Sequence, residues 1–140
     1  LLGEPQIIIL DEPTAGLDPK ERISLRNLIA ELAFDRIVII ATHVVPDVEF
    51  ISKEVLLLKA GEIIDSGAPS DICGAIDNKV AELRIDHRQL KEIRKNMKIA
   101  SLTRDGDEIV ARVISEAAPN GNYHTVAPTL EDLYLYHFGE

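Results

Sequence analysis

Two adjacent acids, Asp11 and Glu12, directly follow a run of branched aliphatic residues, Ile7 to Leu10. Such a run is typical of a strand buried on both faces of a parallel sheet, and the carboxyl ends of these strands form the edge where open α/β sheets bind ligands. A carboxylate fixed there can hold a magnesium ion, and a neighbouring one can orient or deprotonate an attacking water. We therefore predict that Asp11 is the metal ligand and Glu12 the general base.

A histidine is expected at the same edge. Residues 36–41 form a second apolar segment, which Thr42 and His43 follow. A strand, a helix and a second strand make a βαβ unit with a right-handed crossover and parallel strands, so both strands end at the same edge. An isolated histidine is usually structural or exposed, but this position predicts that His43 faces the acid pair.

The segment between the two strands carries the signals of a helix start. Asp18 can cap the helix, Pro19 suits its first position, and Glu21 stands three residues beyond the cap. The apolar residues that follow have helical spacing, which predicts one face packed on a sheet: Leu25, Leu28, Ile29 and Leu32. The polar residues on the other side are expected to form a solvated face: Arg22, Arg26, Asn27 and Glu31.

The residues after the acid pair make its context specific. Acids often follow a buried strand only because the chain is reaching solvent, but residues 7–19, with the sequence IIILDEPTAGLDP, resemble the Walker B strand, catalytic glutamate and D-loop of the ATP-binding-cassette (ABC) ATPases. The resemblance implies that Asp11 is the magnesium-associated acid, that Glu12 is the general base, and that the D-loop residues Gly16 and Asp18 lie at the nucleotide site and cross to a second subunit. Residues 41–43 resemble the H-loop of this family, which implies that His43 contacts the γ-phosphate.

The rest of the sequence predicts a hairpin and a second subdomain. Residues 54–59 and 62–66 are expected to be strands around a turn in which Gly61 takes the left-handed conformation. The predicted domains are the C-terminal half of an ABC nucleotide-binding domain at 1–69, a linker at 70–78, and a small α+β subdomain at 79–140. The fold class is therefore α/β, with a partial P-loop NTPase-like parallel sheet and a closing hairpin, followed by a small α+β C-terminal subdomain.

The C-terminal subdomain is predicted to have the order β-α-β-β-α with a half-exposed antiparallel sheet. A loop is expected at 117–122, and Thr129 can cap a last helix with Asp132 at its third position. The ending, residues 128–134, resembles the close of ABC subunits that serve separately encoded exporter permeases. The alternative for this ending is a packing extension without regulatory meaning.

Composition and charge exclude several classes of function. Hydrophobic residues make up 46% of the chain, yet no apolar run approaches the ~18 residues of a membrane helix. Fifteen Lys and Arg against 24 Asp and Glu give a net charge of -9, which disfavours binding to nucleic acid or anionic lipid. The single cysteine, Cys73, excludes an internal disulfide and is typical of a reducing compartment. Three further histidines have no metal-ligand spacing and are predicted to be surface or packing residues: His87, His124 and His137.

The sequence lacks the Gly-rich phosphate-binding loop of the ABC family with its lysine, the Gln-containing loop, the Ser-Gly-Gly signature and the aromatic that stacks on the base. The chain does not begin with Met and its only Met is Met97, so we expect a segment of a longer protein. Without the phosphate-binding loop we expect the isolated chain to be inactive, and we expect the apolar faces of its two parallel strands to be exposed.

The function predicted from the resemblance is that of an ATP-binding and ATP-hydrolysing subunit of an ABC transporter. The implied cofactors are ATP and Mg²⁺, and the implied partners are an integral membrane permease and a second nucleotide-binding subunit, in a homodimer, with no nucleic acid. The implied location is cytoplasmic, on the inner face of the cell membrane. Two alternatives stay open: an ABC-type ATPase of DNA repair or translation, which the lack of coiled-coil heptads and basic runs disfavours, and a non-catalytic interaction module. The transported substrate and the choice of ATP over GTP are not encoded in these residues.

Overall fold

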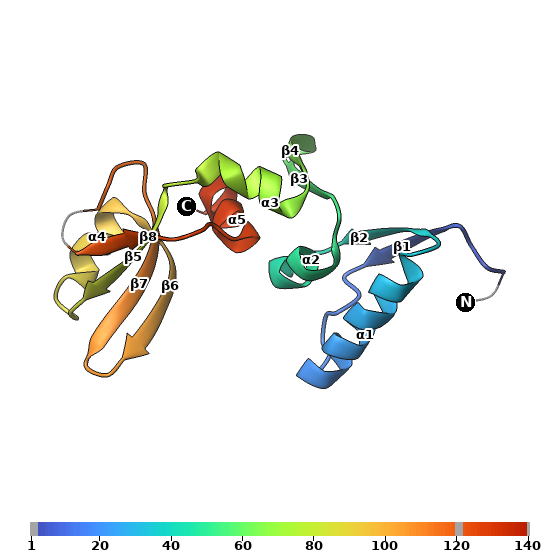
Figure 1. The fold of residues 1–140 in the computed structure, drawn as a ribbon, viewed down its shortest axis with the longest axis horizontal. Coiled ribbons are helices and arrows are strands. Elements are labelled where there is room, and N and C mark those ends of the chain that lie inside the picture. The colour runs from blue at the N-terminus through green and yellow to red at the C-terminus, as the bar shows by residue number, and fades with distance from the viewer. Residues whose placement is uncertain (1–2, 120–121, 140) are drawn as a thin grey trace. The chain divides into compact units, whose positions relative to one another are not determined.

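The structure is a computed structural model that describes residues 3–119 and 122–139. The described residues form two compact units, of which the first ends at Val55 and the second begins at Leu56. Small parallel and antiparallel sheets combine with helices, so the predicted mixed α/β class is confirmed (Figure 1). Among the described residues, none of the helices has both the length and the apolar character that crossing a bilayer requires.

The first unit is built on two parallel strands. β1 (Ile7–Asp11) pairs with β2 (Ile37–Ala41) in a register that sets Ile7 opposite Ile37 and Asp11 opposite Ala41. α1 (Pro19–Leu32) connects the two strands, and Figure 1 shows it running beside them. The βαβ unit with parallel strands is thus confirmed, and both strands end at the same edge.

One face of this strand pair is covered and the other is exposed. Ile8 is 8% exposed, whereas Ile7 and Ile9 are 55% and 71% exposed, and Ile37 and Ile39 on β2 are 60% and 51% exposed. The physical reason is that successive side chains of a strand point to opposite faces, and a single long helix covers one face of a pair. Burial of β1 on both faces is therefore wrong for the described residues, whereas the exposure of an apolar strand face is confirmed.

α1 begins with the predicted capping box. The Asp18 carboxylate accepts a hydrogen bond from the Glu21 N–H at 2.8 Å, and the Glu21 carboxylate accepts one from the Asp18 N–H at 3.2 Å. On the face expected to be packed, Ile29 is buried but Leu28 is 49% exposed. Of the four residues predicted to form a solvated face, Asn27 and Glu31 are exposed, which confirms their part of the prediction. The prediction is wrong for Arg22 and Arg26, which are half-buried against the next helix.

Beyond β2 the chain forms α2 (Val45–Ile51) and then the predicted hairpin of β3 (Val55–Lys59) and β4 (Glu62–Gly67). Both turn residues have positive φ, 52° at Ala60 and 84° at Gly61, as two-residue hairpin turns of type I′ require. The left-handed conformation predicted at Gly61 is confirmed. The segment expected to be a linker holds the short helix α3 (Pro69–Cys73) and the 3₁₀ turn η1 (Gly74–Ile76).

The second unit contains a four-stranded antiparallel sheet in the order β6-β7-β5-β8. Its strands are β5 (Val80–Ile85), β6 (Lys98–Asp105), β7 (Glu108–Ile114) and β8 (Tyr123–Thr125). The predicted antiparallel sheet is confirmed, but β8 was not predicted because three residues are too short to display an alternating pattern. Of the loop predicted at 117–122, residues 120 and 121 lie outside the described part of the chain.

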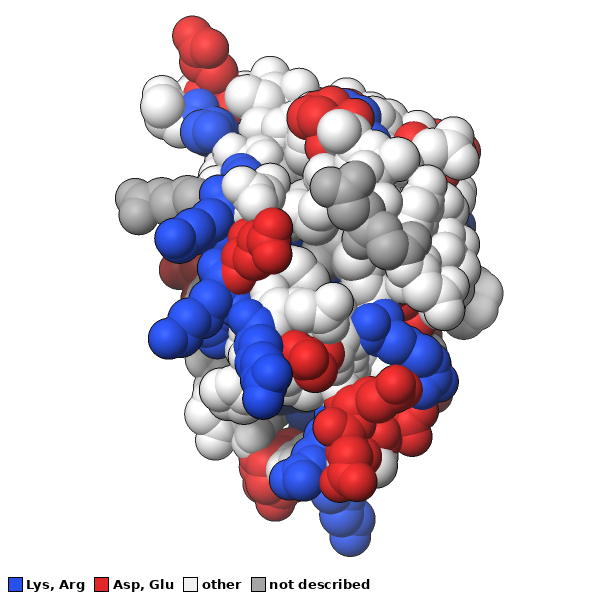
Figure 2. Space-filling model, turned by 90° about the vertical axis from the view of Figure 1, so that its left-hand side faces the viewer, with Lys and Arg blue, Asp and Glu red and all other residues white. Residues whose placement is uncertain are grey.

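α4 (Leu90–Asn96) lies against one face of this sheet. Five buried apolar side chains form the core there: Ala81, Leu83, Ile85, Ala111 and Val113. The partly buried side chains of Leu90 and Ile93 pack on this core from α4. On the outside, Figure 2 shows acidic and basic side chains on the same face, with several basic ones along the left side and others among acidic ones at the right and the lower end.

α5 (Leu130–Phe138) is held to the sheet by a buried ion pair. Asp132, only 1% exposed, accepts hydrogen bonds from Arg112 Nη2 at 2.7 Å and from Arg112 Nε at 3.1 Å, and it completes a capping box with Thr129. Burial raises the pKa of Asp132, but the hydrogen bonds from Arg112 and Thr129 outweigh this effect and leave the pKa below its ordinary value. The capping box predicted at this helix is confirmed.

We predict that Asp132→Asn lowers the free energy of unfolding of the second unit by about 3 kcal/mol, because the partly buried Arg112 guanidinium loses its nearer counter-charge and is left with the Glu82 carboxylate at 3.4 Å. Because the folded-state pKa of Asp132 is lowered, its contribution is present above the unfolded-state pKa and is lost as the pH falls through the folded-state pKa. Urea denaturation at neutral pH and in acid measures both effects. Asp107→Asn, in the exposed turn, is the matched control, and equal stability of the two variants would contradict the prediction.

Candidate functional site

Glu12 is the centre of the site because its carboxylate lies against the end of the neighbouring strand. Glu12 Oε2 accepts a hydrogen bond from Thr42 Oγ1 at 2.8 Å, and Glu12 Oε1 accepts one from the His43 N–H at 3.0 Å. Glu12 Oε1 also lies 2.6 Å from His43 Nδ1. Because an ionised carboxylate only accepts hydrogen bonds, Nδ1 carries the hydrogen in this contact. The structure thus places Glu12 and His43 together at the predicted edge, while their catalytic roles stay a prediction.

The backbone of Glu12 explains the direction of its side chain. Glu12 has φ 45°, and its N–H donates to the Ala41 carbonyl at 2.8 Å, one step beyond the strand pairing. A left-handed conformation costs a residue other than glycine about 1–2 kcal/mol. Here it ends β1 and turns the carboxylate toward the end of β2, where the hydrogen bonds from Thr42 and His43 offset the cost.

The same contacts set the electrostatics of the site. The pKa of Glu12 lies below its ordinary value, chiefly because of the hydrogen bond from the His43 side chain and next because of the hydrogen bond from Thr42. Burial acts in the opposite direction and raises this pKa, but its effect is smaller. Glu12 is therefore ionised throughout the neutral range. The side chain of His43 is 76% exposed and that of Glu12 is 35% exposed, so both can be reached from solvent.

Thr42 is a further site residue, whose role the sequence pattern does not predict. Its hydroxyl donates to Glu12 Oε2 and accepts a hydrogen bond from the Val44 N–H at 3.0 Å. One side chain thus connects the carboxylate to the backbone that follows His43. The signal in the sequence was a hydroxyl residue directly after an apolar strand and directly before the histidine.

The other predicted site residues lie in the same loop system but outside this cluster. Asp11 is the exposed last residue of β1, and Gly16 is exposed with φ 75°, a conformation that favours glycine. The Asp18 carboxylate is used as the cap of α1. Within the described part of the chain, no hydrogen bond or ion pair joins these three residues to Glu12 or His43.

Asp11 offers one oxygen ligand to a metal ion. Over residues 3–119 and 122–139 there is no cluster of three or more His, Cys, Asp and Glu side chains that could hold a metal by itself. Magnesium usually keeps several waters and binds through one or two carboxylates plus substrate phosphates. Asp11 therefore fits Mg²⁺ only as a single ligand beside a bound nucleotide.

Two of the other histidines have structural contacts, since His124 lies 3.2 Å from Glu82 and His137 packs edge-on against Tyr136.

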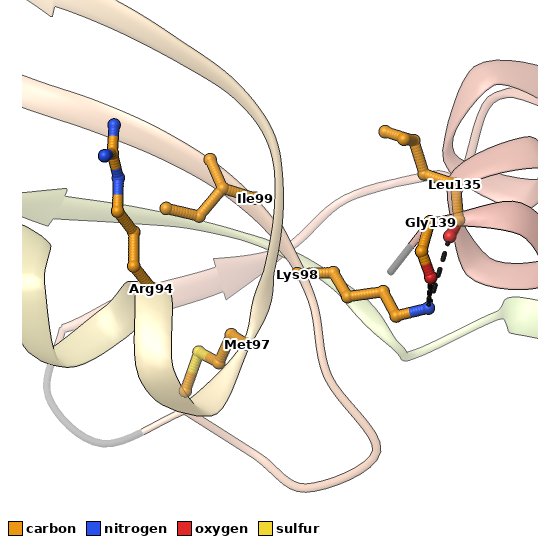
Figure 3. A pocket seen from close by; sticks show the side chains of 6 residues that line it. All are labelled: Arg94, Met97, Lys98, Ile99, Leu135 and Gly139. Atoms are coloured by element: carbon orange, nitrogen blue, oxygen red, sulfur yellow. Dashed lines mark hydrogen bonds between the residues drawn. The ribbon is translucent and has the colours of Figure 1, made fainter.

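The second unit contains a cavity of about 380 Å³ (Figure 3). It is lined by Arg94, Met97, Lys98, Ile99, Leu135 and Gly139. The Lys98 ammonium donates to the carbonyls of Leu135, Tyr136 and Gly139 at the end of α5. These carbonyls occupy the Lys98 ammonium, which therefore caps the end of α5.

Comparison with known proteins relates about half of the chain to ABC transporter ATP-binding proteins. It is 43% identical over 78 residues, 55% of this chain, to the energy-coupling factor transporter ATP-binding protein EcfA2 of Lactococcus lactis subsp. cremoris. It is 38% identical over 74 residues, 51% of this chain, to EcfA2 of Lactiplantibacillus plantarum, and 37% identical over 82 residues, 57% of this chain, to the phosphonates import ATP-binding protein PhnC 2 of a Synechococcus species.

The matches cover 27%, 25% and 30% of these three relatives, so the chain spans less than a third of their length. No family model matches the chain. These relatives support the resemblance to ABC ATP-binding proteins over about half of the chain. They do not address the C-terminal position of the segment or the exporter type.

We predict that Thr42→Val raises the pKa of Glu12, because the hydroxyl that stabilises the ionised carboxylate is removed. The measurement is a pH titration of the Glu12 side-chain carboxyl by carbon-13 NMR. Thr42→Ser keeps the hydroxyl and is the matched control, for which we expect little change. An unchanged Glu12 pKa in Thr42→Val would show that the hydrogen bond at 2.8 Å does not form in solution.

Proposed function

We propose that this chain is the part of an ABC transporter ATP-binding subunit that activates water for ATP hydrolysis. The observation that carries the proposal is the contact of Glu12, at the end of β1, with His43, at the end of β2. The similarity of about half of the chain to ABC transporter ATP-binding proteins supports it. The names of these relatives favour a transporter subunit over an ATPase of DNA repair or translation.

In the proposed reaction Glu12 is the general base. Its carboxylate is ionised, has an exposed edge and lies at the sheet edge where a substrate would bind. The hydrogen bonds that lower its pKa also make it a weaker base. Glu12 becomes a stronger base when it exchanges one of its present donors for the attacking water, whose proton it accepts.

His43 is the donor best suited to this exchange. While Nδ1–H donates to Glu12, the other ring nitrogen of a neutral imidazole can only accept a hydrogen bond. A phosphate oxygen also only accepts. His43 can therefore donate to the γ-phosphate either as an imidazolium or after it releases Glu12 and changes tautomer. In the second case the same movement binds the phosphate and frees the base.

Asp11, Gly16 and Asp18 complete the proposed site. Asp11 would hold Mg²⁺ through one carboxylate oxygen, and the metal would neutralise the charge that develops on the phosphate oxygens. The exposed turn at Gly16 and the capped start of α1 at Asp18 would face the second subunit of a homodimer. The support for the dimer is the resemblance of residues 15–18 to the D-loop of the family.

The proposed setting is the cytoplasmic face of the cell membrane, where the subunit would dock on an integral membrane permease. We propose an exporter with a separately encoded permease, and the support is the resemblance of residues 128–134 to the ends of such subunits. The word import belongs to the name of the phosphonate relative and describes that protein. We further propose that the intact protein is longer and supplies the Gly-rich phosphate-binding loop, because these residues contain none.

In the protein that contains both this chain and a phosphate-binding loop, we predict that Glu12→Gln keeps ATP binding and lowers turnover by roughly 10² to 10⁴, the usual contribution of a positioned general base. ATPase rates and nucleotide affinity measure the two effects. Glu31→Gln, on the exposed face of α1, is the matched control. Turnover of Glu12→Gln at the level of this control would remove Glu12 from the mechanism.

For the isolated chain we predict neither measurable ATP binding nor hydrolysis. The triphosphate would be held chiefly by backbone N–H groups and a lysine that these residues do not provide, and Asp11 alone is a weak magnesium ligand. Titration calorimetry with magnesium and ATP, with sedimentation to follow self-association through the exposed strand face, tests this. A micromolar dissociation constant in a monomer would show that the nucleotide site has been misplaced.

A further inference from the structure

Asp47 is a buried carboxylate in α2, the helix that follows His43, and it is only 4% exposed. Two arginines of α1 approach it: Arg26 Nη1 lies 3.5 Å from Asp47 Oδ1, and Arg22 Nε lies 4.0 Å from Asp47 Oδ2. The Arg26 guanidinium also lies 4.8 Å from the centre of the Phe50 ring on α2. These three charged side chains, Arg22, Arg26 and Asp47, form what we call the α1–α2 clamp.

The clamp attaches α2 to α1 through charged side chains. A helix of seven residues is too short to be stable by itself in water, and α2 has no side-chain cap at its N-terminus. A buried carboxylate is tolerated only when it is paired, and removal of one partner leaves an uncompensated charge. The position of α2 therefore depends on the two arginines of α1.

The clamp is held by charge attraction more than by directed hydrogen bonds. Within the described residues, Asp47 Oδ2, Arg22 Nε and Arg26 Nε are buried without a hydrogen-bond partner. Coulomb attraction falls slowly with distance and has no preferred direction. Such a contact holds α2 on α1 without a strict hydrogen-bond geometry.

The first turn of α2 is continuous with the site. The Val45 N–H donates to the His43 carbonyl at 3.1 Å, and the Asp47 N–H donates to the Val44 carbonyl at 3.1 Å. The Val44 N–H donates to the Thr42 hydroxyl, which holds Glu12. A displacement of Asp47 therefore reaches His43 through backbone hydrogen bonds and Thr42 through the bond from the Val44 N–H to its hydroxyl.

We infer that Asp47 is a positioning residue: clamped by Arg22 and Arg26, it fixes α2 on α1 and so keeps the His43 imidazole against Glu12. The effect on the geometry of His43 follows from the structure of the first unit alone. The effect on turnover rests on the proposed function. The two consequences can be measured separately.

The test of geometry is the tautomer of His43, read by nitrogen-15 NMR of the 140-residue chain at a pH where the ring is neutral. The wild-type ring should carry its hydrogen on Nδ1, because Glu12 accepts it. Asp47→Asn should shift the ring toward the Nε2–H tautomer that free histidine prefers. Asp35→Asn, an exposed acid of the same unit, should leave the tautomer unchanged.

Hydrogen exchange of α1 separates positioning from unfolding. Exchange of residues 19–32 should stay at the wild-type rate in Asp47→Asn, while residues 43–52 exchange about 10-fold faster. If Asp47→Asn unfolds α1 as well, the tautomer of His43 is measured in Asp47→Glu. This variant keeps the negative charge and should therefore keep the Nδ1–H tautomer. An Nδ1–H tautomer that persists in a folded Asp47→Asn chain, or that is lost in Asp47→Glu with α1 intact, overturns the inference.

The second arm measures turnover in the protein that contains this chain and a phosphate-binding loop. Asp47→Asn should lower kcat about 10-fold with the KM for ATP within about twofold, because a displaced group loses orientation and not substrate binding. Asp47→Glu should restore part of kcat. A tautomer that shifts without any change in kcat would leave the positioning intact and contradict the proposed function, whereas an unshifted tautomer contradicts the positioning itself.

Discussion

The arrangement of the first unit depends on one carboxylate and the donors that hold it. Glu12 leaves β1 in a left-handed conformation and accepts hydrogen bonds from Thr42 and His43 at the end of β2. This contact is possible only because the parallel register sets Asp11 opposite Ala41. A shift of one residue along either strand would turn these side chains to the opposite faces of the sheet. The pairing of two short strands thus decides which groups meet at the edge.

The two helices of the unit help to keep that register. α1 begins at Asp18, whose carboxylate caps it, and its buried Ile29 lies on the covered side of the unit. α2 is short, and the buried charge of Asp47 keeps it near α1. The residues at the edge are therefore held by hydrogen bonds in the loop and by charge between the helices, while the opposite apolar face of the strands is exposed. Such a face is typical of a surface that another segment or chain covers.

Much of this could be predicted from the sequence because it depends on local signals. The apolar runs, the capping residues around Asp18 and Thr129, and the turn at Gly61 identify their elements directly, and the parallel rule brings Glu12 near His43. The role of Thr42 and the pairing of Asp47 with two arginines could not be predicted, because periodicity alone assigned Arg22 and Arg26 to solvent. Their partner comes from another helix, and a single sequence does not contain that contact.

His43 holds the Glu12 carboxylate, and the pKa of Glu12 reports this contact most directly. Carbon-13 NMR titration of the 140-residue chain, as wild type and as His43→Ala, measures it. The wild-type Glu12 should titrate below the ordinary value of a glutamate, because the hydrogen bond from His43 stabilises its ionised form, and loss of the imidazole should raise the pKa. A wild-type Glu12 that titrates at the ordinary value, with no change in His43→Ala, would contradict the site described above.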